Sequence, residues 1–72
     1  MKLPPDPDDM NEDRAEFAAT AMDAFRTVCR TDDCDALTDL LADLMHWADR
    51  NGGKFGRAMR LARQHYIEET RA

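Results

Sequence analysis

The sequence predicts an all-α fold: a three-helix bundle preceded by a disordered, acidic, proline-containing arm. Three runs of apolar residues recur at three- and four-residue spacing, the period of an amphipathic helix. Two short segments of helix-capping and helix-terminating residues separate the runs, and no useful stretch alternates with the period of a strand. Because 72 residues suffice for only one small core, we expect an arm over residues 1–10 and a single three-helix domain over residues 11–72.

The arm and the first helix differ in composition. Pro4, Pro5 and Pro7 stand among acidic residues, and because proline fixes φ and lacks an N–H, this segment should be extended and mobile. From about Glu12 to Arg30 the apolar residues return with helical spacing, and carboxylates occupy the first turns, where the helix dipole favours them. The predicted stripe is Phe17, Ala18, Ala21, Met22, Phe25, Val28 and Cys29.

The second and third helices are bounded by clear local signals. Thr31-Asp32-Asp33 provides capping side chains for a second helix, which should stop at Asn51-Gly52-Gly53 because glycine adopts the left-handed conformation that closes a helix. A third helix follows from Phe55 to about Thr70, although Gly56 weakens its first turn. We expect these two helices to form a hairpin, crossed by the first, that buries Leu37, Leu41, Leu44, Met45, Phe55, Met59, Ala62 and Tyr66.

Charge is divided unevenly along this acidic chain, which has a formal net charge of −5. Before Arg50, 13 acidic residues face 4 basic ones, whereas from Arg50 onward 6 basic residues face 2 acidic ones. With no apolar leader and no run of membrane-spanning length, the sequence predicts a soluble cytoplasmic protein that does not contact a membrane. Two cysteines are too few for the disulfide framework of a small secreted domain.

Metal and disulfide sites are weighed against simpler interpretations. Asp39, Asp43 and His46 share a helical face, but a solvated acidic face is favoured over a metal site, which needs more ligands and a supporting shell. Cys29 and Cys34, with His46 and His65, match no familiar zinc spacing, so we expect neither a metal nor a cofactor. Buried free thiols are favoured for both cysteines over a disulfide across the turn.

Three sets of residues remain as candidates for interaction. The first is an acidic face at the second helix: Asp32, Asp33, Asp35, Asp39 and Asp43. The second is a basic side of the third helix: Arg57, Arg60 and Arg63. This side could neutralise phosphates, but in an acidic protein its pairing with acidic helices is favoured over nucleic-acid binding. The third is a set of apolar residues at the edges of the stripes, Trp47, Leu61 and Ile67, which predicts self-association as a homodimer.

Part of the chain resembles a group of short uncharacterised proteins from bacteria, phages and mobile elements. The similarity is carried by Asp43-Leu44-Met45-His46-Trp47 and Ala62-Arg63-Gln64-His65-Tyr66, within about half of the chain. Relatives often place an acidic residue beside the position of Phe55, where Lys54 and Gly56 stand here. There is also a distant likeness to all-α nucleotide pyrophosphatases, but their Glu-Glu-x-x-Glu metal motif is missing, and we expect no enzyme activity.

The resemblance implies a mobile-element setting, in which small acidic proteins, anti-CRISPR proteins among them, often inhibit a host protein by binding it. An acidic surface can occupy a basic groove meant for nucleic acid. The sequence therefore predicts a non-enzymatic protein-binding module whose acidic face meets a basic surface of a nucleic-acid-handling host protein. The alternative is a small nucleic-acid-binding or regulatory accessory protein that acts through its third helix.

Overall fold

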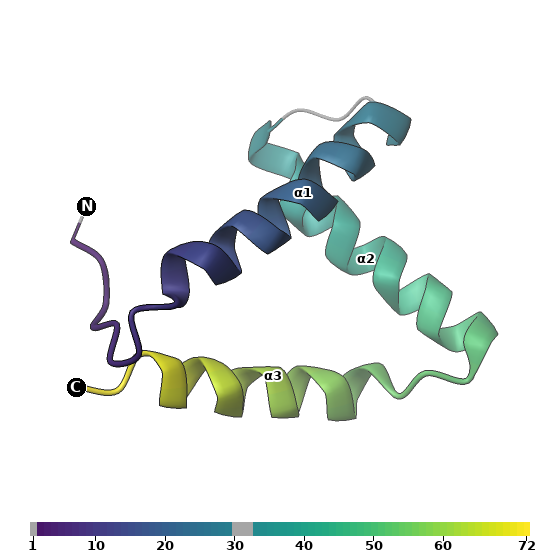
Figure 1. The fold of residues 1–72 in the computed structure, drawn as a ribbon. Coiled ribbons are helices and arrows are strands. Elements are labelled where there is room, and N and C mark those ends of the chain that lie inside the picture. The colour runs from purple at the N-terminus through teal and green to yellow at the C-terminus, as the bar shows by residue number, and fades with distance from the viewer. Residues whose placement is uncertain (1, 30–32) are drawn as a thin grey trace.

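The computed structural model describes residues 2–29 and 33–72, apart from the side chains of residues 33 and 34, and within them the chain is an all-α three-helix bundle (Figure 1). The helices are α1 (Asn11–Cys29), α2 (Asp33–Asn51) and α3 (Phe55–Glu69). The predicted fold class is confirmed, and the three predicted helices are found within one residue of their expected ends where those ends are described.

The arm leads into α1 through a hydrogen-bonded turn. Residues 2–10 contain neither helix nor strand, and the N–H of Asp9 donates to the carbonyl oxygen of Asp6 at 3.1 Å. Asp9 has a φ of 59°, in the left-handed region that aspartate tolerates better than most residues. The carboxylates of Asp6 and Asp8 accept hydrogen bonds from the N–H groups of Asn11 and Met10, both at 3.2 Å. Arm side chains therefore satisfy donors at the start of α1.

The connection between α2 and α3 is a helix-terminating glycine turn. Gly52 has a φ of 71°, and the N–H of Gly53 donates to the carbonyl oxygen of Ala48 at 3.0 Å, the longer bond of a Schellman motif. Gly53 also approaches Ala48 so closely that an added Cβ would lie 3.2 Å from the Ala48 Cβ. α3 begins at Phe55 although Lys54 provides no side-chain cap. Lys54 and Gly56, which stand where similar proteins often have an acidic residue, therefore do not prevent the helix from starting there.

The three helices lie along the sides of a flat triangle (Figure 1). α1 crosses α2, the glycine turn joins α2 to α3, and the end of α3 returns to the start of α1. The Cα atoms extend over 37 × 27 × 17 Å, so the third dimension of the molecule is less than half of the first. Each helix therefore contacts its neighbours mainly near the corners.

The predicted burial of the apolar stripes within one chain is wrong. Of the hydrophobic residues described, only Ala36 and Ala48 are buried, at 0% and 5% exposure. Leu37 is 59% exposed and Leu44 41%, and the same holds for most of the stripe that was expected to close the hairpin. The periodicity identified the apolar faces, but the α2–α3 turn opens the two helices instead of laying them together. The apolar faces border the interior of the triangle, and most of their large side chains remain exposed.

Candidate interaction surfaces

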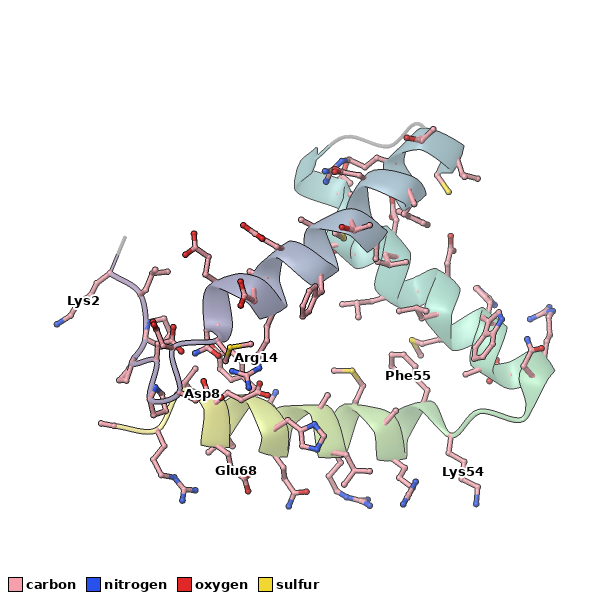
Figure 2. The ribbon with its side chains drawn as sticks, in the orientation of Figure 1. Lys2, Asp8, Arg14, Lys54, Phe55 and Glu68 are labelled. Atoms are coloured by element: carbon pink, nitrogen blue, oxygen red, sulfur yellow. The ribbon has the colours of Figure 1, made fainter. Side chains whose placement is uncertain are left out.

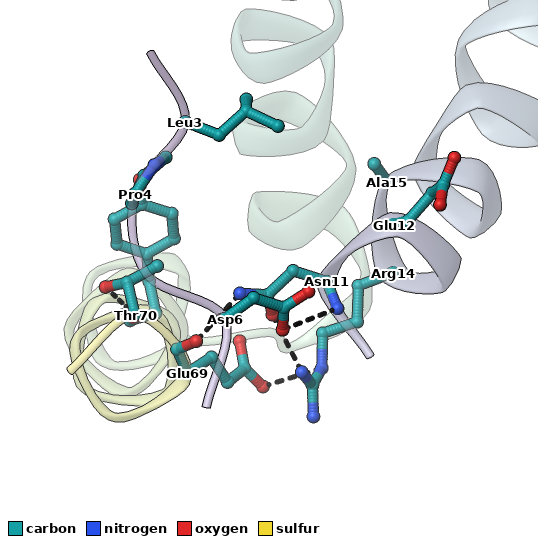
Figure 3. A pocket seen from close by; sticks show the side chains of 10 residues that line it. Leu3, Pro4, Asp6, Asn11, Glu12, Arg14, Ala15, Glu69 and Thr70 are labelled. Carbon is teal, nitrogen blue, oxygen red and sulfur yellow. Dashed lines mark hydrogen bonds and ion pairs between the residues drawn. The ribbon is translucent and has the colours of Figure 1, made fainter. Parts of the chain in front are cut away.

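A polar cluster joins the beginning of α1 to the end of α3 and so forms the third corner of the triangle. The side-chain amide of Asn11 donates to the carbonyl oxygen of Glu69 at 2.7 Å, satisfying an acceptor at the C-terminus of α3. The guanidinium of Arg14 lies 3.1 Å from the Glu69 carboxylate (Figure 3). Asp8 of the arm accepts two hydrogen bonds from the same guanidinium, at 2.7 and 2.9 Å. Arg14 therefore connects the arm, α1 and α3.

The charges of this corner influence one another although they remain in contact with solvent. Hydrogen bonding to Arg14 lowers the pKa of Asp8 below its ordinary value, with a further contribution from the N–H of Met10. The same carboxylate raises the pKa of Arg14, which is protonated at all physiological pH values in either case. We refer to Asp8, Asn11, Arg14 and Glu69 as the polar corner.

A pocket of about 620 Å³ lies beside the polar corner. The arm contributes Leu3 and Pro4 to its wall, α1 contributes Ala15, and α3 contributes Tyr66 (Figure 3). Its lining mixes apolar side chains with carboxylates and carries no histidine or cysteine. It is an open recess between three segments, and Tyr66, 58% exposed, is its aromatic surface.

A second, almost wholly apolar groove of about 330 Å³ runs between α2 and α3. Leu41, Leu44 and Trp47 line it from α2, and Phe55 and Met59 line it from α3. Figure 2 shows Phe55 projecting toward the interior of the triangle, whereas Lys54 and Glu68 project from the other side of the chain. The apolar stripe of each helix therefore borders this groove, and Lys54 is the one charged residue that lines it.

The predicted acidic face is found on α2 as far as the structure describes it. Asp35, Asp39 and Asp43 are exposed and follow one another at four-residue intervals, which places them on one side of the helix. Among the described residues, Asp35 and Asp43 make no ion pair. Asp32 lies outside the described residues, as does the side chain of Asp33.

The basic side of α3 is also exposed. Arg57, Arg60 and Arg63 make no ion pair with any carboxylate in the part of the chain that the structure describes. The predicted pairing with the acidic helices is therefore not found among the described residues of one chain, because Glu69 of α3 contacts α1 and the arginines are exposed to solvent. Pairing of these arginines across two chains stays a prediction.

The three apolar edge residues do not form one patch of equal exposure. Trp47 is 61% exposed and lines the α2–α3 groove, and Ile67 is 49% exposed on α3. Leu61 is partly buried. Trp47 is thus part of the groove wall, in continuity with Leu44 and Met59, and this continuity was not visible in the sequence.

Cys29 was expected to be buried, and this expectation is wrong. Its thiol is free and exposed, since α1 packs on α2 through a different part of its surface. The side chain of Cys34 lies outside those described. Over the described residues no group of three or more His, Cys, Asp or Glu side chains is placed to hold a metal ion. The same part of the chain has no helix that combines the length and apolar character needed to cross a membrane.

Sequence reasoning missed the polar corner. Asn11 and Glu69 are 58 positions apart, and nothing in the local pattern around either residue signals their contact. One signal was available: Arg14 is the only basic residue among the carboxylates at the start of α1. Such a residue is well placed to pair with an acidic partner from elsewhere in the chain.

Comparison of the chain with protein-family models, curated proteins and solved structures found no match. The candidate surfaces therefore rest on the geometry and chemistry of this chain alone.

Proposed function

We propose that this chain is a non-enzymatic protein-binding module whose acidic face on α2 occupies a basic surface of a partner protein. The partner class that fits best is a nucleic-acid-handling protein of a host, inhibited by occupation of its binding groove, as anti-CRISPR proteins inhibit theirs. The observation that carries the proposal is the row of Asp35, Asp39 and Asp43, which are exposed on one side of α2 at four-residue intervals.

Long-range electrostatics support this function. A chain of net charge −5 is attracted to a lysine- and arginine-lined groove before contact, and this attraction raises the association rate. Aspartates four residues apart on a helix are about 6 Å apart along its axis, close to the spacing of successive phosphates on one nucleic-acid strand. A row of this kind can present carboxylates to cations that normally contact a phosphate backbone.

The test compares two variants of equal net charge. The first removes three carboxylates from the proposed face: Asp35→Asn, Asp39→Asn and Asp43→Asn. The matched control removes three exposed carboxylates from the first turns of α1: Glu12→Gln, Asp13→Asn and Glu16→Gln. Each immobilised protein is incubated with host lysate, and captured proteins are identified by mass spectrometry.

We expect the wild-type chain and the control to capture the same nucleic-acid-handling protein, and the α2 variant to lose it. Raising the salt concentration should release the partner, because exposed charges are screened beyond about 10 Å at 0.1 M ionic strength. Added DNA or RNA should compete with capture. Equal capture by the two variants would show that net charge, and not the α2 face, determines binding, and would reject the proposal.

A second candidate function is supported by the unpaired arginines of α3. Arg57, Arg60 and Arg63 are exposed and make no ion pair with the described carboxylates, so they are open to contact with phosphates. A gel-shift titration of labelled DNA and RNA at micromolar protein, repeated at two salt concentrations, tests this function directly. A salt-sensitive shift that is lost in Arg57→Gln/Arg60→Gln would favour nucleic-acid binding over the protein-binding function.

A further inference from the structure

The triangle cannot fill its own interior without losing a corner. Helices of 19, 19 and 15 residues have lengths of about 28, 28 and 22 Å at 1.5 Å per residue. One corner is the α1–α2 crossing, where Ala36 is fully buried, and the second is the glycine turn packed on Ala48. The polar corner is the third. With three sides of set length and three fixed corners, the arrangement in Figure 1 is determined.

The faces that border this interior are apolar. Leu41, Leu44, Phe55 and Met59 line the α2–α3 groove. Phe17 lies one turn after Arg14 on the same side of α1, the side that reaches α3, and is 71% exposed. Tyr66 lies one turn before Glu69 on the side of α3 that reaches α1. We call these six residues the inner face: Phe17, Leu41, Leu44, Phe55, Met59 and Tyr66.

The accessible surface of the chain is larger than that of a compact monomer of the same mass. The chain has 6311 Å² of accessible surface, whereas a compact monomer of 8.2 kDa has about 4,500 Å², an excess of about 1,800 Å². Obligate homodimers bury about 1,000–2,500 Å² on each chain. The arm accounts for part of the excess, but of the large hydrophobic residues described as exposed, all except Leu3 and Met10 belong to the helices.

The radius of gyration also matches that of an assembly of two chains. The radius of gyration is 14.0 Å, whereas compact chains of 72 and 144 residues have values of about 11 and 14.5 Å. The open chain already has the size of a globule made from two copies.

We propose that the inner face is the interface of a homodimer in which each copy packs its apolar stripes into the open interior of the other. A two-fold axis brings the same face of each chain together, so the six residues of the inner face meet an apolar surface. This interface is separate from the α2 acidic row and does not depend on the proposed function.

The primary test uses the unmodified full-length chain. Sedimentation equilibrium should give a mass of about 16 kDa, twice that of one chain, at tens of micromolar. Thermal unfolding should be linked to association, so that a 100-fold increase in concentration raises the Tm by about 10 °C. A mass of 8.2 kDa at hundreds of micromolar together with a Tm independent of concentration would overturn the proposal. A trimer or larger closed assembly would overturn it too.

Two lysine substitutions on α3 locate the interface. Met59→Lys places a charge on the inner face, whereas Gln64→Lys adds the same charge at an exposed position about 140° away around the helix. We expect Met59→Lys to weaken dimerisation about 100-fold or more, because it buries an unpaired ammonium, and Gln64→Lys to leave it within about threefold. If Met59→Lys prevents folding, the concentration dependence of the wild-type Tm still decides. Equal dimerisation of both variants would refute the assignment to the inner face.

Discussion

The three glycines of the chain give a sharp test of the fold, because the same substitution has a different consequence at each. Gly52 has a φ of 71°, and nothing lies within 4 Å of an added Cβ, so the penalty of Gly52→Ala is purely conformational. The left-handed region costs an L-residue about 1–2 kcal/mol. Part of this penalty is offset, because alanine lowers the conformational entropy of the unfolded chain and so stabilises the folded state by about 0.4–1 kcal/mol. We expect a net loss of about 1 kcal/mol.

Gly56 provides the matched control. It lies in the first turn of α3, has no neighbour within 4 Å of an added Cβ, and adopts helical backbone angles that alanine prefers. Gly56→Ala should therefore stabilise the protein by about 0.5–1 kcal/mol. Gly53→Ala should destabilise it for a third reason, since its Cβ would lie 3.2 Å from the Cβ and 3.3 Å from the Cα of the buried Ala48.

The assay is chemical denaturation followed by helical circular dichroism, with all variants at one protein concentration because association contributes to stability. The expected order of stability is Gly56→Ala, wild type, Gly52→Ala. The two variants should differ by roughly 2 kcal/mol. If Gly52→Ala is as stable as the wild type, Gly52 does not terminate α2 in the left-handed conformation, and the chain leaves α2 by a different turn.

Four further outcomes are expected. Ala36→Leu should destabilise by about 1–3 kcal/mol in denaturation, because Ala36 is fully buried, and a neutral result would contradict the α1–α2 crossing. Arg14 lowers the pKa of Asp8 in the folded protein. The stability that this pair contributes is therefore complete above the unfolded pKa of 3.8, and it is lost as the pH falls through the lower pKa of the folded state. Asp8→Asn should remove this pH dependence from the measured Tm. Cys29 should react with a thiol reagent in native buffer as fast as a model thiol, and protection until denaturant is added would contradict its exposure. EDTA should leave the helical circular dichroism unchanged, and a loss of signal would reveal a structural metal.

Local signals were enough to predict the helices. The three- and four-residue spacing of apolar side chains identified each helix and its apolar stripe, and Gly52 identified the end of α2, because helix periodicity and termination depend on residues within one or two turns. The acidic row on α2 followed from the same periodicity. For this reason the positions of Asp35, Asp39 and Asp43 on one exposed side were predictable without a structure.

The relation between the helices was decided by the tertiary structure. The sequence indicated that the stripes had to be covered, and we expected them to cover one another, but the direction in which Gly52 and Gly53 send the chain opens α2 away from α3. The polar corner depends on Asn11 and Glu69, which are 58 residues apart and carry no local mark of their contact. An amphipathic pattern specifies that a helix face is apolar, but the surface that buries this face depends on long-range geometry. An apolar stripe covered by its own chain has the same period as a stripe covered by a second copy, so the sequence pattern does not distinguish them.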